Sequence, residues 1–267
     1  MTKAKRTFRE ERLELIYKVI QEKQKVFVPE LAKQFDISES SVRLDLAELE
    51  SHNLIMRTHG GAILKNGLSS NFVINVDTIN NRITHFEKEK DAIAQKTASI
   101  IEDGDTIMMD GGSTTRCLAK YLVNKKNLTV ITNSLDLIPE FVVNPNVNLY
   151  ILGGFAFKEG GIVVGPMTNE YITQFHPNKA ILGIDGISLD KGLTAANASN
   201  PSISSAKVKM VEVSDQLIIV SDHSKLNRVC LMPIAPIEAM DVLVTDSGAS
   251  PEILEEIRKR GPKVLVA

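Results

Sequence analysis

Seven short apolar runs in the C-terminal two-thirds of the chain constrain its fold more than any other feature. They lie at residues 106–109, 129–132, 149–152, 180–184, 217–220, 241–245 and 263–266. Segments of helical character precede or separate most of them, at about 88–101, 114–123, 135–143, 167–176, 203–214 and 251–260. Near-continuous apolar strands that alternate with helices predict an α/β domain with a mostly parallel sheet, covered on both faces.

The first 60 residues follow a different pattern, which predicts three helices. Apolar residues recur at helical spacing from Leu13 to Ile20 and mark one buried face. A short second helix begins at Pro29, a position where proline is tolerated, and ends at Phe35. Ser38 is a favourable N-cap for a third helix over about 39–52.

Two glycines then interrupt a pair of short β-capable runs within residues 55–64, which predicts a hairpin. Three helices followed by a hairpin predict a winged helix-turn-helix, and the alternative is a winged-helix module that binds protein. We therefore expect a DNA-binding domain at 1–64, with the helix-turn-helix at about 25–44. A polar, turn-rich linker follows at 65–82, and an effector domain at 83–267.

Composition excludes several classes of protein. Cys117 and Cys230 are the only cysteines and lie far apart, so we expect no disulfide framework and a reducing, cytoplasmic location. No apolar run is long enough to span a membrane, and no apolar stretch follows the basic N-terminus as in a signal peptide. The five histidines lack metal-ligand spacing, so we expect no metal and no cofactor. The net charge of −2 gives no DNA signal of its own.

The residues that follow each strand are the most informative for chemistry, because parallel sheets bind ligands beyond the carboxyl ends of their strands. Asp110-Gly-Gly-Ser-Thr-Thr115 follows the first strand and leads into a helix, so hydroxyls and free helix N–H groups could bind an anion. The segment matches neither a P-loop nor a dinucleotide fingerprint. The alternative is a capped turn without a ligand.

Further polar groups end the other strands. Glycines, hydroxyls, amides, an acid and a base would meet at one edge, which suits a phosphorylated, polyhydroxylated small molecule. A turn or cap role is the alternative for each residue taken singly. The candidate effector-binding residues are Asp110, Gly112, Ser113, Thr114, Thr115, Asn133, Ser134, Gly154, Asp185 and Lys225.

Taken together, these motifs resemble the DeoR family of bacterial transcription regulators over nearly the whole chain. The motifs are residues 28–50 with 57–62, Gly104-Asp-Thr-Ile, residues 110–115, Thr132-Asn-Ser134, Leu152-Gly-Gly154, Gly183-Ile-Asp-Gly186, Gly192-Leu-Thr194 and Asp222-His-Ser-Lys225. The resemblance implies a repressor whose C-terminal domain is similar to ribose-phosphate isomerase and glucosamine-phosphate deaminase folds. It also implies that a phosphorylated sugar or polyol binds this domain and changes DNA affinity.

The chain departs from the family pattern at two places. The recognition helix reads Ser41-Val-Arg-Leu-Asp-Leu46, with Leu44 where a second basic residue is usual, so the operator could differ. Ser205-Ala206 stands where the family often has Glu-Ala. The related isomerases use an acid in this region for proton transfer, so its absence favours a sensor over an enzyme.

We expect the third helix to enter the major groove of a double-stranded operator, with base contacts near its start. Phosphate contacts would come from the wing and the N-terminal arm. The candidate DNA-binding residues are Ser40, Ser41 and Arg43 for bases, and Arg57, His59, Arg9 and Arg6 for phosphates. A homo-oligomer, dimer or tetramer, would read paired half-sites.

The sequence therefore predicts a regulator, most simply a repressor of a sugar or polyol catabolic operon, although activation stays open. The alternative is a sugar-phosphate isomerase with an accessory DNA-binding domain, in which Asp185 and Lys225 would be the catalytic groups.

Overall fold

The computed structural model describes residues 9–23, 25–51, 54–58, 60–64, 72–73, 79–196 and 200–267. The chain divides into two compact units, Met1–Asn75 and Val76–Ala267. The exact bounds expected for the two domains and the linker stay predictions. Helix α4 (Ile79–Thr84) begins inside the segment expected to be the linker.

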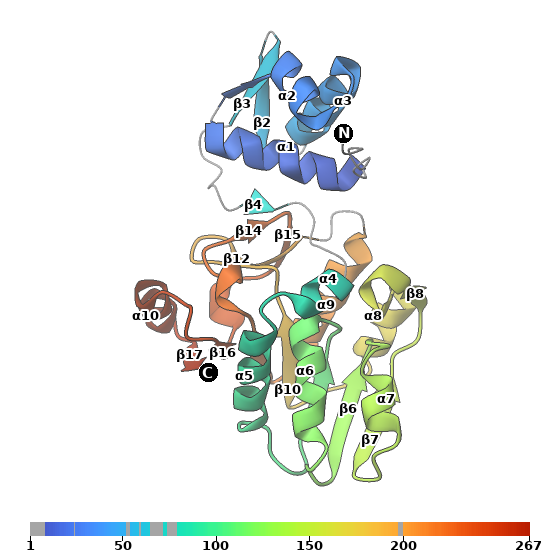
Figure 1. Ribbon diagram of the computed structural model, residues 1–267. Coiled ribbons are helices and arrows are strands. Elements are labelled where there is room, and N and C mark those ends of the chain that lie inside the picture. Colours follow the sequence, from blue (N-terminus) through green and yellow to red (C-terminus); the bar gives the residue numbers. More distant parts are fainter. Residues whose placement is uncertain are drawn as a thin grey trace. The chain divides into compact units, whose positions relative to one another are not determined.

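The N-terminal unit has the three helices and the wing that the sequence predicts (Figure 1). Helix α1 spans Arg9–Lys23, α2 spans Val28–Phe35 and α3 spans Glu39–Ser51. Strands β2 (Ile55–Thr58) and β3 (Gly61–Leu64) pair antiparallel as the wing. One core cluster joins α1, α2, α3 and both wing strands.

Local chemistry sets the boundaries of these helices. Pro29 lies in the first turn of α2, and Asp36 ends that helix in the left-handed region at φ 52°. Ser38 Oγ accepts a hydrogen bond from the Ser41 N–H at 3.1 Å, which is the N-cap interaction that the sequence predicts.

A third strand of the wing sheet was not anticipated. Strand β1 (Lys25–Phe27) pairs antiparallel with β3, with Val26 buried between exposed neighbours. A three-residue strand is too short to carry a period-2 signal. Gly61 permits this close pairing, because a Cβ there would lie 2.0 Å from the Val26 carbonyl oxygen.

The C-terminal unit is built on a seven-stranded parallel sheet in the order β17-β16-β13-β10-β5-β6-β7. The strands are β5 (Thr106–Met109), β6 (Leu128–Thr132), β7 (Val147–Ile151), β10 (Lys179–Gly183), β13 (Gln216–Val220), β16 (Val242–Thr245) and β17 (Lys263–Val266). They coincide with the seven apolar runs to within two residues at each end. The predicted mostly parallel α/β architecture is confirmed.

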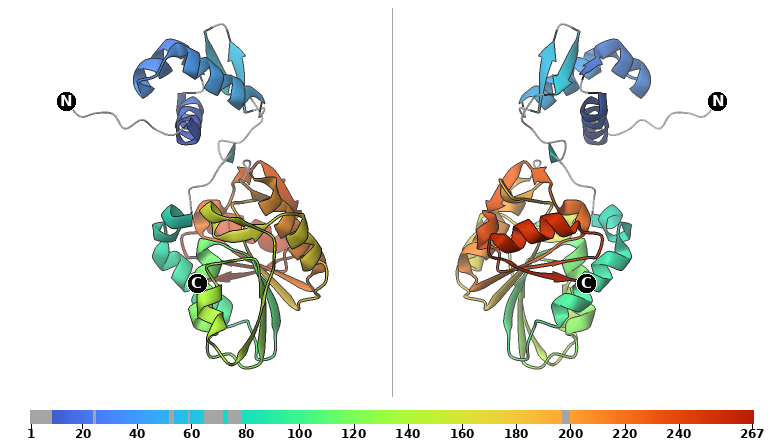
Figure 2. Two further views of the ribbon diagram at one scale, coloured as in Figure 1. Left: turned by 90° about the vertical axis from the view of Figure 1, so that its right-hand side faces the viewer. Right: turned by 90° about the vertical axis from the view of Figure 1, so that its left-hand side faces the viewer.

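Helices cover both faces of this sheet (Figures 1 and 2). One face packs against α5 (Glu87–Ala98), α6 (Ser113–Leu122) and α7 (Ile138–Val142). The other packs against α8 (Pro166–Ile172), α9 (Pro201–Val213) and α10 (Pro251–Lys259). Successive strand residues alternate between the two clusters, so Ile107 and Met109 face one and Met108 faces the other.

Shorter elements complete the unit. Strands β8 (Phe155–Phe157) and β9 (Ile162–Val164) form a hairpin, and β11 (Gly186–Ser188), β12 (Gly192–Ala195) and β15 (Met232–Ala235) form a small antiparallel sheet. The remaining short strands are β4 (Phe72–Val73) and β14 (Val229–Cys230). Single 3-10 turns occur at Lys158–Gly160 (η1), His223–Lys225 (η2) and Ile237–Ala239 (η3). The sequence did not predict these seven strands of the C-terminal unit and the segment before it, because each strand is short and depends on tertiary pairing.

Candidate functional sites

The start of α3 presents the residues expected to read DNA bases. Ser40 is exposed and Ser41 is partly exposed, and Ser41 Oγ lies 2.9 Å from Ser38 Oγ. The Arg43 side chain is 58% exposed and forms a 2.6 Å ion pair with Glu39, one turn earlier on the helix. A pair this exposed contributes little to stability, so Arg43 can exchange Glu39 for another acceptor at small cost.

Arg57 on the wing is also held by an acid. Its Nε lies 2.7 Å from Glu50 Oε2, and its backbone N–H donates to Glu50 Oε1 at 2.9 Å. The hydrogen bonds from Arg57, backbone first, lower the pKa of Glu50. This pair fastens strand β2 to α3 and leaves the Arg57 side chain 46% exposed at the surface.

Sequence reasoning missed a buried pair beneath the recognition helix. Arg12 Nε and Nη2 donate to the two carboxylate oxygens of Asp45, at 2.7 and 3.0 Å. The Asp45 side chain is 1% exposed, so the pair ties α1 to α3 from inside. The adjacent Leu44 is 64% exposed on the outer face of α3.

Three expected phosphate contacts fall outside what the structure describes. Arg6 and His59 lie outside the described residues, and for Arg9 only the backbone, as the first residue of α1, is described. Their DNA-binding roles stay predictions.

In the C-terminal unit the order of the strands identifies a ligand position. The chain starts at β5, adds β6 and β7 on one side, and then crosses to β10 on the other. The point where the order reverses therefore lies between β5 and β10, and open α/β sheets bind ligands beyond the strand ends there. Asp110 follows β5 and Asp185 lies just after β10, so two predicted residues flank this point.

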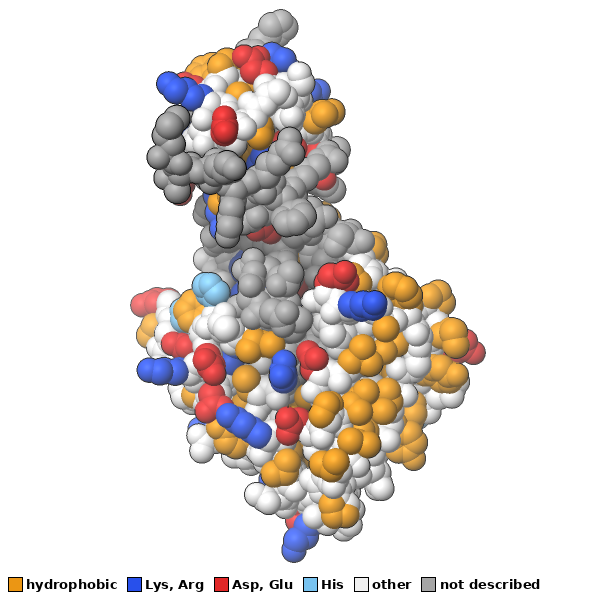
Figure 3. Space-filling view, turned by 45° about the vertical axis from the view of Figure 1, so that its right-hand side comes forward, with side chains coloured by type: hydrophobic (Ala, Val, Ile, Leu, Met, Phe, Trp, Pro, Cys, Tyr) orange, Lys and Arg blue, Asp and Glu red, His pale blue; other side chains and the backbone are white. Residues whose placement is uncertain are grey.

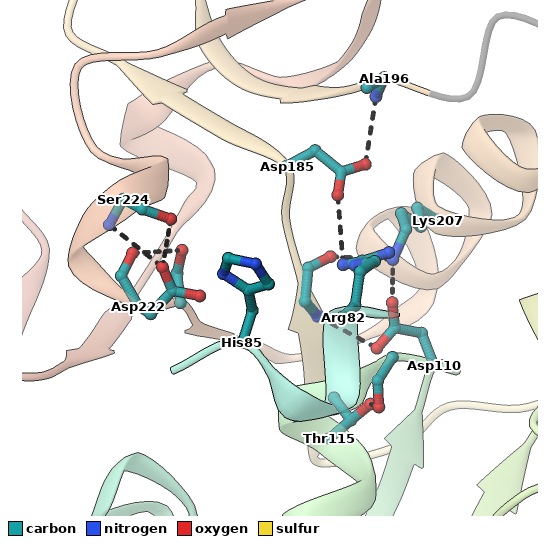
Figure 4. A network of polar contacts seen from close by, with 12 residues as sticks. Arg82, His85, Asp110, Thr115, Asp185, Ala196, Lys207, Asp222 and Ser224 are labelled. Carbon is teal, nitrogen blue, oxygen red and sulfur yellow. Dashed lines mark hydrogen bonds and ion pairs between the residues drawn. The ribbon is translucent and has the colours of Figure 1, made fainter. Parts of the chain in front are cut away.

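Asp110 forms a buried ion pair with Lys207 of α9 (Figure 4). Lys207 also donates to the Gly183 carbonyl at 2.8 Å, and Asp110 Oδ1 accepts from the Gly183 N–H at 3.1 Å. Burial, with a smaller contribution from the positive charge of Arg82, lowers the pKa of Lys207 to about 7. Asp110 is thus held by the protein itself.

Asp185 is likewise engaged on both oxygens (Figure 4). Its Oδ1 lies 3.3 Å from Arg82 Nη2, and its Oδ2 accepts from the Ala196 N–H at 3.1 Å. Arg82 belongs to α4, and its charge also affects the pKa values of Lys90, Lys207 and Lys225, which places it among these cations. Lys90 donates to the carbonyls of Arg82 and His85 and so fixes the end of α4.

The glycine-rich segment after β5 opens α6 as the sequence predicts. Gly112 is the N-cap residue in extended conformation, without a side-chain cap, so the first N–H groups of α6 have no side-chain acceptor there. Thr115 Oγ1 donates to the Gly112 carbonyl at 3.0 Å. Ser113, Thr114 and Thr115 are all buried, in keeping with a closed pocket wall as well as with a capped turn.

The next strand ends carry three further predicted residues, Asn133, Ser134 and Gly154. Asn133 Nδ2 donates to the Val163 carbonyl at 2.9 Å, whereas its buried Oδ1 has no hydrogen-bond partner among the described residues. The Ser134 N–H donates to Thr132 Oγ1 at 3.0 Å. Gly154 has a packing role, because at φ +146° a Cβ would lie 2.2 Å from Thr168 Oγ1.

Lys225 lies in η2 after β13 and is the cation least committed to the protein. Its side chain forms no hydrogen bond or ion pair with any residue that the structure describes. Burial is the main cause that lowers its pKa, and Asp222 opposes the shift. Asp222 itself accepts from the Ser224 backbone and hydroxyl, which closes the turn that carries Lys225.

Sequence reasoning missed Arg82, Lys90, Lys207 and the contact of His223 with Asp246, whose Nδ1 and Oδ2 lie 2.7 Å apart. Arg82 lies in the segment taken as linker, and Lys207 lies on a helix rather than at a strand end. The only available signal for Lys207 is a charge at a buried helical position, beside Ala206 and Met210. Within the described ranges no cluster of His, Cys, Asp or Glu could hold a metal ion, and no helix could cross a membrane.

Comparison with known proteins assigns both units. Residues 12–67 match the DeoR-like helix-turn-helix domain, and residues 85–247 match the DeoR C-terminal sensor domain. The chain therefore belongs to the DeoR family of DNA-binding transcriptional regulators, as the motifs predict.

Full-length relatives agree with this assignment. The chain is 35% identical over 248 residues to the transcriptional repressor AccR of Agrobacterium fabrum, covering 92% of this chain and 93% of the relative. It is 30% identical to the HTH-type transcriptional repressor GlcR of Bacillus subtilis, covering 97% and 96%. It is also 30% identical to the glycerol-3-phosphate regulon repressor of Escherichia coli, covering 90% and 92%.

Solved structures are more distant. A D-ribose-5-phosphate isomerase in complex with phospho-erythronic acid has a TM-score of 0.38 at 18% identity, over 52% of this chain and 54% of that one. RipA from Yersinia pestis has a TM-score of 0.43 at 15% identity, over 64% and 51%.

Proposed function

We propose that this regulator represses a sugar or polyol catabolic operon and that a phosphorylated sugar or polyol, bound between β5 and β10, changes its affinity for the operator. The observation that carries the proposal is a group of cations around the residues that follow β5, β10 and β13. Arg82, Lys207 and Lys225 come from three separate elements, and Lys225 has no acceptor within the described structure.

A phosphate group would supply the acceptor that these cations lack. The charge of Lys207 is balanced by Asp110. Arg82 Nη2 lies 3.3 Å from Asp185 Oδ1, a distance that leaves its guanidinium available to a stronger acceptor. Lys225 and Arg82 would therefore bind the phosphate. The N-terminal N–H groups of α6, next to Ser113, Thr114 and Thr115, would add hydrogen bonds from a helix end that favours negative charge.

Hydroxyl groups of the ligand would meet neutral polar groups after β6 and on α9. Asn133 Oδ1 is buried with a free lone pair, and Ser204 Oγ on α9 is buried without a partner in the described part of the chain. Both fit a ligand that offers several hydroxyl donors. Gly112, Ser134 and Gly154 complete the set of residues that we expect to line the ligand.

The same geometry supports a sensor over an isomerase. Asp110 and Asp185 are each held by a cation and a backbone N–H, so neither carboxylate is poised over an empty position as a general base. The glycerol-3-phosphate regulon repressor, a full-length relative, is named for a phosphorylated polyol.

Transmission to DNA would use α4. Arg82 lies on this helix, the first described element after the segment that joins the two units. A phosphate that draws Arg82 from Asp185 would favour one position of α4 over another, which gives the ligand the differential affinity that regulation requires. The N-terminal unit would bind paired half-sites as part of a homo-oligomer, with Ser40, Ser41 and Arg43 over bases and Arg57, His59, Arg9 and Arg6 near phosphates.

Fluorescence anisotropy on DNA from upstream of the gene tests the proposal, at fixed salt, against random DNA and with a panel of pentose, hexose and polyol phosphates. One phosphate should shift specific binding of the wild type. Lys225→Ala should bind the operator as the wild type does but weaken the response to that phosphate about 10–100-fold. Arg82→Gln should weaken the response as well, and because it also releases Asp185, its operator affinity without ligand should differ from that of the wild type. Arg258→Gln, an exposed arginine on α10, is the matched control and should respond normally.

Two results would contradict the proposal. A normal response in Lys225→Ala would remove that residue from the site. Turnover of ribose 5-phosphate or a hexose phosphate, without specific DNA binding, would establish the isomerase alternative.

A further inference from the structure

A large apolar surface lies on the C-terminal unit around the edge strand β7; of the residues assigned to the effector, Gly154 adjoins it at Phe155. Six side chains define this apolar face: Val142, Val143, Tyr150, Ile151, Phe155 and Met167. Each is at least 50% exposed, and Val143 reaches 79%. Figure 3 shows hydrophobic side chains gathered over this side of the molecule, with few charges among them.

The six side chains of the apolar face come from connected elements around the edge strand β7, on which Tyr150 and Ile151 lie on opposite sides. Val142 ends α7 and Val143 follows it, and α7 packs against β7, which carries Tyr150 and Ile151. Phe155 begins β8, whose partner β9 contacts α8, the helix of Met167. Gly153, between β7 and β8, lies against the ring of Tyr171 on α8.

The area of the apolar face is large for a monomer. With roughly 150–200 Å² for a fully exposed large side chain, these six display on the order of 600 Å² of apolar surface. This value is at the upper end for monomeric proteins, whose largest patch covers about 300–600 Å². A standard protein interface buries about 800 Å² on each partner, so an apolar core of this size, surrounded by a polar rim, is sufficient for a stable interface.

The edge of the sheet lies within the same face. Strand β7 is the last strand of the seven, and no described strand pairs with its outer side. Its sequence, Val-Asn-Leu-Tyr-Ile, contains no charge and no proline, the features that usually protect an exposed edge. The opposite edge strand, β17, begins with Lys263 and shows one large exposed apolar residue, Val266 at 39%.

We propose that a second copy of this chain docks on the apolar face through a twofold axis. A twofold interface uses the same patch on both copies, so one apolar face on each copy is sufficient. Exposed charges around it, Glu140, Lys158 and Glu170, would form the polar rim. This inference rests on the homo-oligomer in the proposed function and adds where its interface lies.

The test compares the mass in solution of full-length variants by sedimentation velocity between about 1 and 50 μM. Ile151→Lys/Phe155→Lys places like charges opposite one another across the twofold axis. Val266→Lys adds the same charge to an exposed apolar residue at the other sheet edge and is the matched control. A second variant, Val143→Asp/Met167→Asp, charges α7 and α8 instead, in case the first pair disturbs folding; circular dichroism checks that each variant is folded.

The wild type and Val266→Lys should share a mass at least twice that of the 29.4 kDa chain. Each folded double variant should lose this association at least 100-fold, to monomer or to half the original assembly. If the wild type oligomerises and the folded double variants keep its mass, the interface lies elsewhere and the proposed homo-oligomer survives. A monomeric wild type at 50 μM would overturn both the interface and the oligomer, leaving the effector and DNA assignments to their own tests.

Discussion

Lys207 of α9 and Asp110 at the end of β5 form an ion pair inside the C-terminal unit, with only 9% and 3% of their side chains exposed. The pair joins the helix on one face of the sheet to the point where the strand order reverses. It therefore holds the wall of the proposed effector site together before any ligand is present.

Below about pH 7, where Lys207 is protonated, Asp110→Asn should destabilise the C-terminal unit by about 3–5 kcal/mol, because it leaves the Lys207 ammonium buried without its counter-charge. Urea unfolding of the full chain measures the loss in the transition of this unit. The double variant Asp110→Asn/Lys207→Met should recover most of it. Glu212→Gln breaks the exposed Lys209–Glu212 pair and should change stability by less than about 0.5 kcal/mol. An Asp110→Asn protein as stable as the Glu212→Gln control would show that the buried pair is not needed.

The low pKa of Lys207 predicts a pH dependence. An unfolded lysine titrates near pH 10.4, whereas burial lowers the folded pKa of Lys207 to about 7. Between these values the unfolded chain holds more protons, so the free energy of unfolding rises with pH. Below about pH 7 Lys207 is protonated in the folded protein, which then carries the full free-energy cost of burying that charge. The free energy of unfolding of the wild type should therefore rise by roughly 1 kcal/mol per pH unit, relative to that of Lys207→Met, between about pH 7.5 and 9.5. Parallel curves for the two proteins would argue that Asp110 keeps Lys207 charged throughout.

Arg43→Ala should reduce the preference for operator over random DNA by about 1–3 kcal/mol, because an arginine near the start of a recognition helix can pair with guanine. Arg57→Ala should instead weaken binding to both DNAs equally. It should also reduce the slope of log binding constant against log salt concentration by about 1, as expected of a phosphate contact. Anisotropy titrations at several salt concentrations separate the two effects. Unchanged discrimination in Arg43→Ala would mean that other residues read the bases.

Arg12→Met should destabilise the N-terminal unit by about 2–3 kcal/mol, because it removes the guanidinium from Asp45, which is 1% exposed. Operator affinity should fall at temperatures where this unit begins to unfold and be retained below them. Thermal melts paired with anisotropy at two temperatures measure this. The double variant Arg12→Met/Asp45→Asn should regain stability. A fall in affinity that is independent of temperature would indicate that Arg12 contacts DNA directly.

Much of the fold could be predicted from the sequence because its signals are local. The runs that became β5, β13 and β16 are apolar over most of their length, as buried parallel strands require. Ser38 caps α3, and glycines turn the wing, for reasons contained within four or five residues. The family motifs likewise lie in short contiguous stretches, so they identified the regulator and the candidate residues Asp110, Asp185 and Lys225.

Only the tertiary structure decided how these residues are partnered. The contacts of Asp110 with Lys207 and of Asp185 with Arg82 each join residues about a hundred positions apart. No periodicity or spacing encodes such a pair, because it depends on where the crossing from β7 to β10 returns the chain. The apolar face on β7 and α7 is invisible in the sequence for the same reason. Apolar residues at strand or helix spacing predict burial, and only the packed molecule shows which of them the protein itself leaves uncovered.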